Sequence, residues 1–192
     1  SMMLISLYLN IPRYFIERSL GTRELGLFAA MAYIVVAGTT VVNALGQAAT
    51  PRLAKLFSAG LYRSFDVLLA KLCGFALLLG GLQVLVSATF GQRLLTLLYR
   101  PEYAKHIDVF LVIMIAAAIG YCGNFLGYAL TAARAFRQSA LVYGAITIVA
   151  LLSALLIPRW GLLGAAWSMC IVAFATCLVP FLVLRQVRSQ HA

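Results

Sequence analysis

Arg13 is the charged group near the start of the chain most able to do chemistry, because it stands in an otherwise apolar segment. Asn10 precedes it by three residues and Glu17 follows it by four, so in a helix the three side chains share one face. A planar guanidinium binds phosphate oxygens through two parallel hydrogen bonds. Inside a membrane an arginine costs about 2.5–3.5 kcal/mol on insertion scales. The pattern predicts an anion site or, alternatively, a structural arginine that pairs with Glu17 or reaches toward the membrane surface.

Two further apolar segments carry polar side chains at helical spacing. Steps of three and four residues place each set on one face of its helix. Three such faces favour an aqueous or ligand-lined cavity between helices. The alternative is that these groups form hydrogen bonds between helices and hold the bundle together. One set is Thr39, Asn43 and Gln47, and the other is Tyr121, Asn124, Tyr128 and Thr131.

Residues suited to covalent chemistry or metal binding are scattered. No Ser/His/Asp set, metal-ligand spacing or phosphate-binding glycine loop occurs, and the two histidines fall in an expected loop and near the end of the chain. The cysteines form no C-x-x-C pair and fall in apolar segments, where they act as small apolar side chains. We therefore expect no enzyme activity, no cofactor and no metal. These residues are His106, His191, Cys73, Cys122, Cys170 and Cys177.

The composition indicates a membrane protein. The 192 residues are 64% hydrophobic and 10% charged, and the mean hydropathy is +0.99, whereas soluble domains carry about 25% charged residues. The net charge of +10 does not predict nucleic-acid binding, because no basic block or aromatic–basic motif accompanies it. Cationic loops that contact anionic lipid headgroups explain it better.

Six segments are long enough to cross a hydrocarbon core about 30 Å thick. They cover approximately 1–20, 24–49, 64–90, 108–133, 138–157 and 161–185. We expect the second to end at the Thr50–Pro51 step and the third at Gly91. The intervening PRLAKLFSAGLYR and GQRLLTLLYRPEYAKH are amphipathic, which suits short helices on the membrane surface or, alternatively, solvated loops. GTRE and IPRWG are expected tight turns. The prediction is a single all-α integral membrane bundle of about six helices.

Six crossings place both ends of the chain on one side of the membrane. If the ends are cytoplasmic, eight cations lie inside and six outside, so the positive-inside rule favours this orientation only slightly. The inside set is Arg52, Lys55, Arg63, Lys71, Arg134, Arg137, Arg185 and Arg188, and the outside set is Arg18, Arg23, Arg93, Arg100, Lys105 and Arg159.

Several motifs resemble the polysaccharide-transporter family of lipid-linked oligosaccharide flippases, within the multidrug/oligosaccharidyl-lipid/polysaccharide exporter superfamily. In order they are NIPRYFIERSLGTRELGLFAAMAYI, ALGQAATPRLAKLFSAG, LLTLLYRPEYAKH and YALTAARAFRQSALVYGAITIVALLSALLIPRWGLLGAAWSM. The resemblance covers nearly the whole chain. It implies one half, the second six-helix lobe, of a two-lobe transporter, so we expect a fragment of a longer protein. The start, SMMLISLYL, has no signal-peptide pattern.

The resemblance also implies a function and partners. The parent protein would flip undecaprenyl-pyrophosphate-linked oligosaccharide across the bacterial cytoplasmic (inner) membrane, for O-antigen, capsule or exopolysaccharide, with both ends cytoplasmic. Arg13 would hold the pyrophosphate, because family members often carry a cation at this position. The expected partners are the lipid-linked oligosaccharide, membrane lipids, the missing first lobe and a polysaccharide polymerase. The residues expected to touch sugars are Asn10, Asn43, Gln47, Asn124 and Tyr128.

Two alternatives remain open on the sequence. One is a cation-coupled multidrug exporter of the same superfamily, for which Glu17 is the only acid placed to be membrane-embedded. The other is a non-transporting scaffold of a glycan-assembly complex, whose polar residues would serve helix packing alone. Water access to positions 10, 43 and 124 would separate a transporter from a scaffold.

Overall fold

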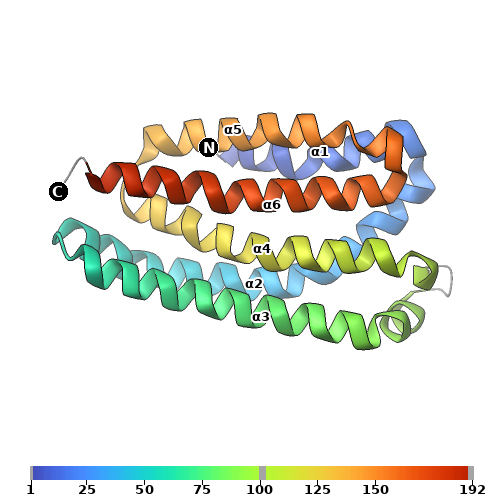
Figure 1. Ribbon diagram of the computed structural model, residues 1–192, viewed down its shortest axis with the longest axis horizontal. Coiled ribbons are helices and arrows are strands. Elements are labelled where there is room, and N and C mark those ends of the chain that lie inside the picture. The colour runs from blue at the N-terminus through green and yellow to red at the C-terminus, as the bar shows by residue number, and fades with distance from the viewer. Residues whose placement is uncertain (1, 100–102, 190–192) are drawn as a thin grey trace.

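The chain forms a bundle of six antiparallel helices that follow one another along its length (Figure 1). The computed structural model describes residues 2–99 and 103–189. Successive helices run in opposite directions, so both ends of the chain lie at one end of the bundle. This confirms the predicted all-α fold. The helices are α1 Met2–Leu20, α2 Thr22–Ser58, α3 Tyr62–Leu98, α4 Ile107–Ala132, α5 Phe136–Ala154 and α6 Ile157–Ser189, with a 3-10 turn η1 Tyr103–His106 before α4.

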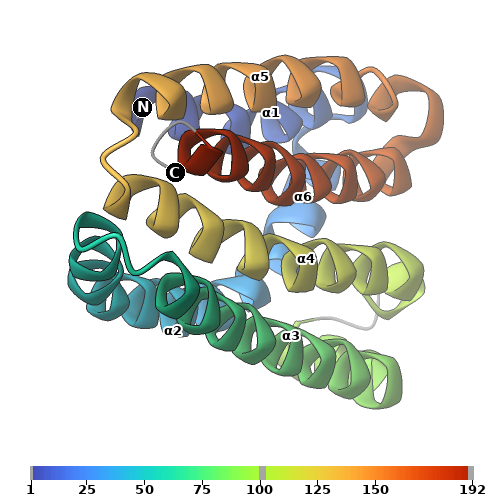
Figure 2. The same ribbon diagram turned by 60° about the vertical axis from the view of Figure 1, so that its left-hand side comes forward.

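The helices form two groups of three that meet along α4 and α6. Figure 2 shows α1, α5 and α6 on one side and α2, α3 and α4 on the other. The contact between α4 and α6 is the most extensive in the bundle, and α4 also packs along α3 and α2. In its most apolar stretch 56% of the residues are buried, against 17% in α3. Helix α4 is therefore the core element, and α3 presents most of its apolar surface outward.

Small residues allow the helices to approach α4 closely. A Cβ atom at Gly80 of α3 would lie 2.7 Å from the Ala118 Cα of α4, and one at Gly123 would lie 3.0 Å from the Thr176 backbone of α6. Close backbone approach through small residues is the usual packing mode of membrane helices. It explains why α4 accommodates neighbours on several sides.

Helix α2 is longer than the sequence predicts, because it continues through Pro51 to Ser58. Proline removes one backbone donor inside a helix, and the expectation of a helix end there was wrong. The Thr50 hydroxyl donates to the Gly46 carbonyl at 2.7 Å, and Leu53, beyond the proline, is fully buried. Packing and side-chain hydrogen bonding hold the extension, as in other membrane helices that contain proline.

Helix α3 likewise continues through Gly91, where we expected its end. Gly91 is a contact point, since a Cβ atom there would lie 2.7 Å from Ile107 Cδ1 and 3.3 Å from the Phe110 ring. Leu95 beyond it is fully buried. The two predicted surface helices are therefore wrong: their described residues belong to the ends of α2 and α3, the turn at residues 59–61 and η1.

The two tight turns centre on glycines with positive φ. Gly21, with φ of 95°, alone separates α1 from α2. In the α5–α6 connection, residues 157–160 form a helical turn that Gly161 interrupts at φ 59° and ψ −140°. Only glycine adopts such backbone angles without steric strain.

Four of the described helical segments are long and apolar enough to cross a membrane: α2, α3, η1 with α4, and the part of α6 up to Val187. The apolar stretch of α5, Gln138–Ala154, is shorter, and α1 carries Arg13, Glu17 and Arg18. At 1.5 Å per residue α2 and α3 are each about 55 Å long, which exceeds a hydrocarbon core of about 30 Å. The six-crossing topology stays a prediction.

Candidate functional site: polar residues of helices α1, α2 and α4

Asn10 and Arg13 form a hydrogen-bonded pair on the outside of α1. The Asn10 amide donates to the Ser6 carbonyl at 2.8 Å, and Arg13 Nη1 donates to Asn10 Oδ1 at 3.5 Å. Arg13 is exposed and Asn10 is half-buried. Within the described residues Arg13 forms no ion pair with Glu17, so the structure does not support the alternative of a structural pair between them. Asn10 Oδ1 accepts from only one of the guanidinium N–H groups, so Arg13 has further donors for another ligand.

Asn43 and Gln47 lie at a different level of the bundle. Asn10 precedes the end of α1 by ten residues, whereas Asn43 follows the start of α2 by 21 residues. Because a single residue joins the two antiparallel helices, a rise of 1.5 Å per residue separates the two asparagines by about 15 Å along the axis. Asn43 is half-buried and Gln47 is exposed. The structure therefore does not bring all the predicted site residues together.

Tyr128 and Asn124 of α4 lie near Asn43 and Gln47 of α2. The Tyr128 ring packs directly on Gly46, where a side chain would overlap it, and Gly46 lies between Asn43 and Gln47 in sequence. Both α4 side chains are half-buried. The predicted site thus divides into two polar levels. The cationic level is Arg13 with Asn10 on α1, and the neutral level at the α2–α4 contact contains Asn43, Gln47, Asn124 and Tyr128.

Tyr121 serves helix packing, as the structural alternative predicted. It is 1% exposed, and its hydroxyl lies 2.6 Å from Gln83 Oε1 of α3 and 3.3 Å from the Val35 carbonyl of α2. Gln83 in turn donates to the Met114 sulfur at 2.9 Å. These hydrogen bonds tie α2, α3 and α4 together. The hydroxyls of Thr39 and Thr131 donate to carbonyls of their own helices.

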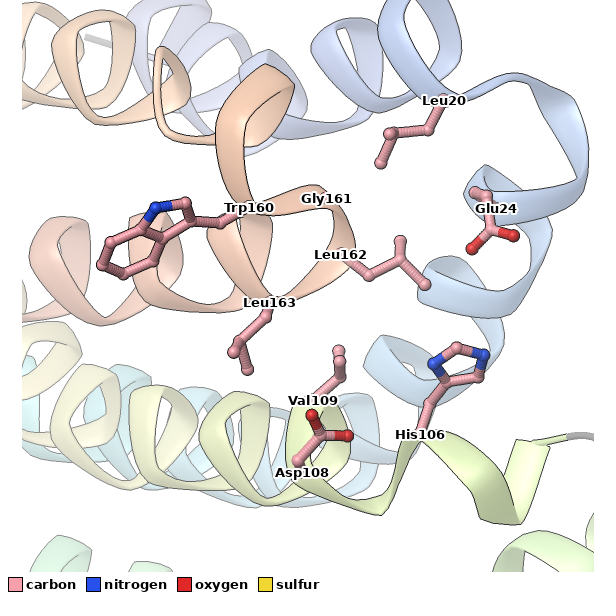
Figure 3. Close-up of a pocket in the computed structure, with 9 residues that line it drawn as sticks. All are labelled: Leu20, Glu24, His106, Asp108, Val109, Trp160, Gly161, Leu162 and Leu163. Atoms are coloured by element: carbon pink, nitrogen blue, oxygen red, sulfur yellow. The ribbon is translucent and has the colours of Figure 1, made fainter.

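The described part of the structure also contains a pocket that the sequence did not predict, at the end of the bundle opposite the chain termini (Figure 3). Its volume is about 260 Å³, and the three inter-helix connections at that end contribute its walls. Glu24 of α2, His106 of η1 and Asp108 of α4 supply its ionisable groups. They are far apart in sequence, so only the fold groups them. No cluster suited to a metal ion occurs among the described residues.

The exposed side chains of α3 and α6 contrast with these polar groups. Large apolar side chains project from both helices and are 45–70% exposed, which in a membrane protein is suited to contact with lipid. They include Leu77, Leu78, Leu82 and Leu85 of α3, and Phe174, Leu178, Phe181 and Leu182 of α6.

One curated protein is similar to nearly the whole chain. It is the capsular polysaccharide biosynthesis protein CapF of Staphylococcus aureus, 28% identical over 183 residues. The match covers 95% of this chain and 46% of CapF, so the chain spans less than half the length of this relative. No protein-family model and no solved structure matches the chain. The chain is thus a helical bundle of membrane-protein character that is similar, over most of its length, to a protein of capsule biosynthesis.

Proposed function

We propose that this chain is one six-helix lobe of a flippase that moves undecaprenyl-pyrophosphate-linked oligosaccharide across the cytoplasmic membrane. The product would be capsule, O-antigen or exopolysaccharide. The similarity to CapF supports a role in polysaccharide biosynthesis, and four membrane-length helices support a location in a membrane. The rest of the protein would supply the first lobe, and a polysaccharide polymerase would take the flipped product.

The exposed charge of Arg13 is the observation that carries this proposal. Within a membrane, an arginine about 10 Å from the end of its helix is costly, which favours a functional role for it. Its hydrogen-bond partner here is the neutral Asn10 side chain, which leaves the charge to be balanced by a ligand. A pyrophosphate has the charge and the paired oxygens that a guanidinium binds best.

The two polar levels suit a long amphiphilic substrate. Arg13 would hold the pyrophosphate, with Asn10 fixing the guanidinium in place. Asn43 and Gln47, about 20–27 Å from the level of Arg13 along the axis, would contact sugars further along the oligosaccharide, together with Asn124 and Tyr128. Binding and reorientation of this kind need no catalytic residue and no cofactor. In the orientation that the positive-inside rule favours, the chain ends and the α2–α3 turn are cytoplasmic.

The test compares Arg13→Ala and Arg13→Lys in the full-length protein, expressed in a strain that lacks its own flippase. Surface polysaccharide and the lipid-linked precursor are measured together. Loss of charged hydrogen bonds worth about 1.5–3 kcal/mol should reduce polymer roughly tenfold or more in Arg13→Ala, with precursor accumulating, and less in Arg13→Lys. Arg18→Ala, on the same helix near its end, is the matched control and should export normally. Normal polymer from a stably inserted Arg13→Ala protein contradicts the proposal.

A further inference from the structure

The α2–α3 hairpin, residues 52–71, projects beyond the α4–α5 turn at the end of the bundle that holds the chain termini (Figure 1). The Tyr128 ring of α4 packs on Gly46 of α2, and the two helices run in the same direction. Helix α4 ends four residues after Tyr128, whereas α2 continues for twelve residues after Gly46. At 1.5 Å per residue, α2 therefore extends about 12 Å further than α4.

The charges of α3 indicate where the hairpin meets the membrane surface. No charged residue occurs between Lys71 and Arg93, and a separation of 22 residues corresponds to about 33 Å of helix. This length matches a hydrocarbon core of about 30 Å, so Lys71 marks one edge of the core. Counted from Gly60 in the turn, Arg52 is eight residues away and Lys71 is eleven. Arg52 therefore lies about 5 Å beyond that edge, at the height of the lipid headgroups.

Aromatic packing fixes the shape of the hairpin. The Phe57 ring meets Tyr62 and Phe65 edge to face, with ring centroids 5.5 and 5.6 Å apart. Leu53 and Phe65, one on each helix, are fully buried. Because the hairpin is already ordered, a ligand that binds its side chains does not have to order the backbone first.

The hairpin is basic, and its cations are exposed. Four cations and one acid, Asp66, give residues 52–71 a net charge of +3. The opposite end of the bundle carries acids as well as cations, so the charge there is mixed. An anionic surface is the partner that complements the hairpin. The four exposed cations of the hairpin are Arg52, Lys55, Arg63 and Lys71, and the described acids toward the opposite end are Glu17, Glu24 and Asp108.

We propose that the α2–α3 hairpin is a binding site for the headgroups of anionic phospholipids. Lys71 and Arg52 lie where the phosphates of a bilayer lie, and Lys55 and Arg63 follow within about 12 Å of the same edge. Each cation close to an anionic membrane surface strengthens binding about fivefold. The long side chains keep their apolar stems along the helices while their charges reach the phosphates. The inference requires that the chain lies in a membrane, and it does not depend on the proposed transport of a substrate.

The first experiment locates the lipid by photo-cross-linking. Full-length protein is placed in phosphatidylcholine vesicles that contain a small fraction of phosphatidylglycerol with a diazirine at the start of one acyl chain. After illumination, cross-links are mapped by mass spectrometry. The phosphatidylglycerol probe should cross-link to residues 52–71 at least fivefold more than a phosphatidylcholine probe with the same diazirine. Equal cross-linking by the two probes overturns the inference.

The second experiment removes the charges. Arg52→Gln with Lys71→Gln should reduce cross-linking of the phosphatidylglycerol probe to the hairpin at least tenfold. Arg93→Gln with Arg159→Gln, two exposed cations at the opposite end, is the matched control and should leave it unchanged. Lys55→Gln with Arg63→Gln, nearer the turn, repeats the test should the first pair of changes lower the melting temperature. Cross-linking that survives both pairs of changes overturns the inference.

Competition distinguishes a phospholipid site from a substrate site. Excess unlabelled phosphatidylglycerol should displace the probe from the hairpin of the wild-type protein. Displacement by undecaprenyl pyrophosphate, with none by phosphatidylglycerol, would mean that the hairpin binds the pyrophosphate of the substrate, and it overturns the phospholipid site.

Discussion

At the scale of single residues, Tyr121 and Tyr33 differ in whether the bundle supplies a hydrogen-bond partner for the hydroxyl. Tyr121 is buried and bonded to α3 and α2, whereas Tyr33 is exposed on α2. The same side chain thus serves packing at one position and faces the surroundings at the other. This difference gives a matched pair of substitutions.

Tyr121→Phe should lower the stability of the protein, because it removes the hydroxyl and leaves Gln83 Oε1 without its donor at 2.6 Å. The expected loss is about 1 kcal/mol, in the range of hydrogen bonds between membrane helices, or a fall in melting temperature of about 2–4 °C. Thermal unfolding in detergent measures it. Tyr33→Phe is the control and should unfold as the wild type does. Equal melting temperatures for the two variants would show that the Tyr121 hydroxyl contributes nothing.

Glu17→Gln separates the proposed flippase from a cation-coupled exporter. Glu17 is exposed and does not pair with Arg13 in the described structure, so the flippase account gives it no essential part. Polymer export should therefore stay within about twofold of wild type, since exposed charges of this kind contribute little. A drug-accumulation assay in the same cells reports on the alternative. Efflux that depends on Glu17, with export unaffected by Arg13→Ala, would favour the exporter.

At the scale of elements, close packing against α4 is the feature that fixes the bundle. Gly80→Ala should destabilise the protein by about 1–3 kcal/mol, the typical result of overpacking, because the new methyl group meets the Ala118 backbone. Gly81→Ala is a control one residue away, and its Cβ meets nothing within 4 Å. It should leave stability unchanged or raise it slightly, since alanine favours helix. Thermal unfolding of both variants measures this difference. A Gly80→Ala protein as stable as the wild type would mean that α3 and α4 lie further apart than the structure shows.

The elements also show what the sequence can predict. Long apolar segments identify all six helices, and those ending at Leu20 and Ala132 lie within a few residues of their predicted bounds. The helix ends predicted at Pro51 and Gly91 were wrong. Both residue types usually break helices, but Leu53 beyond Pro51 and Leu95 beyond Gly91 are fully buried in the bundle. Burial depends on contacts distant in sequence, which local patterns do not contain.

The candidate site shows the same limit. Helical spacing correctly groups Asn10 with Arg13, which share a hydrogen bond. It cannot compare levels on different helices, so it did not predict that Asn43 lies about 15 Å from Asn10 along the axis, with Gln47 further away. The pocket of Glu24, His106 and Asp108 depends on three connections meeting at one end and was missed for that reason.

At the scale of the whole molecule, the antiparallel order of helices predicts which connections share a side of the membrane. The α2–α3 and α4–α5 turns lie at the end that holds both chain termini, and the other connections lie at the opposite end. If the termini are cytoplasmic, a cysteine at Gly60 should resist an impermeant thiol reagent added to intact cells. A cysteine at Thr22 should react. The reverse pattern would invert the topology, and reaction at both positions would contradict the alternating arrangement.

The charges on the two ends bear on the same orientation. At the end with the termini, the exposed cations include Arg52, Lys55 and Arg63 of the α2–α3 hairpin, and at the other end they include Arg93 and Arg159. Arg100 and His191 lie outside the described residues, as do the side chains of Arg137 and Arg188. If the termini are cytoplasmic, the hairpin adds positive charge on the side that the positive-inside rule favours, while exposed Arg18, Arg23 and Lys105 lie at the other end.

The most direct test of the central claim is translocation by the purified full-length protein in lipid vesicles. Fluorescent undecaprenyl-pyrophosphate-linked oligosaccharide is incorporated, and the fraction accessible to an enzyme added outside is followed with time. We expect wild-type protein to expose the inner-leaflet pool and Arg13→Ala to do so at least tenfold more slowly, with Arg18→Ala equal to wild type. Equal rates with Arg13→Ala, or no translocation by wild-type protein that is correctly folded in the vesicles, would contradict the account.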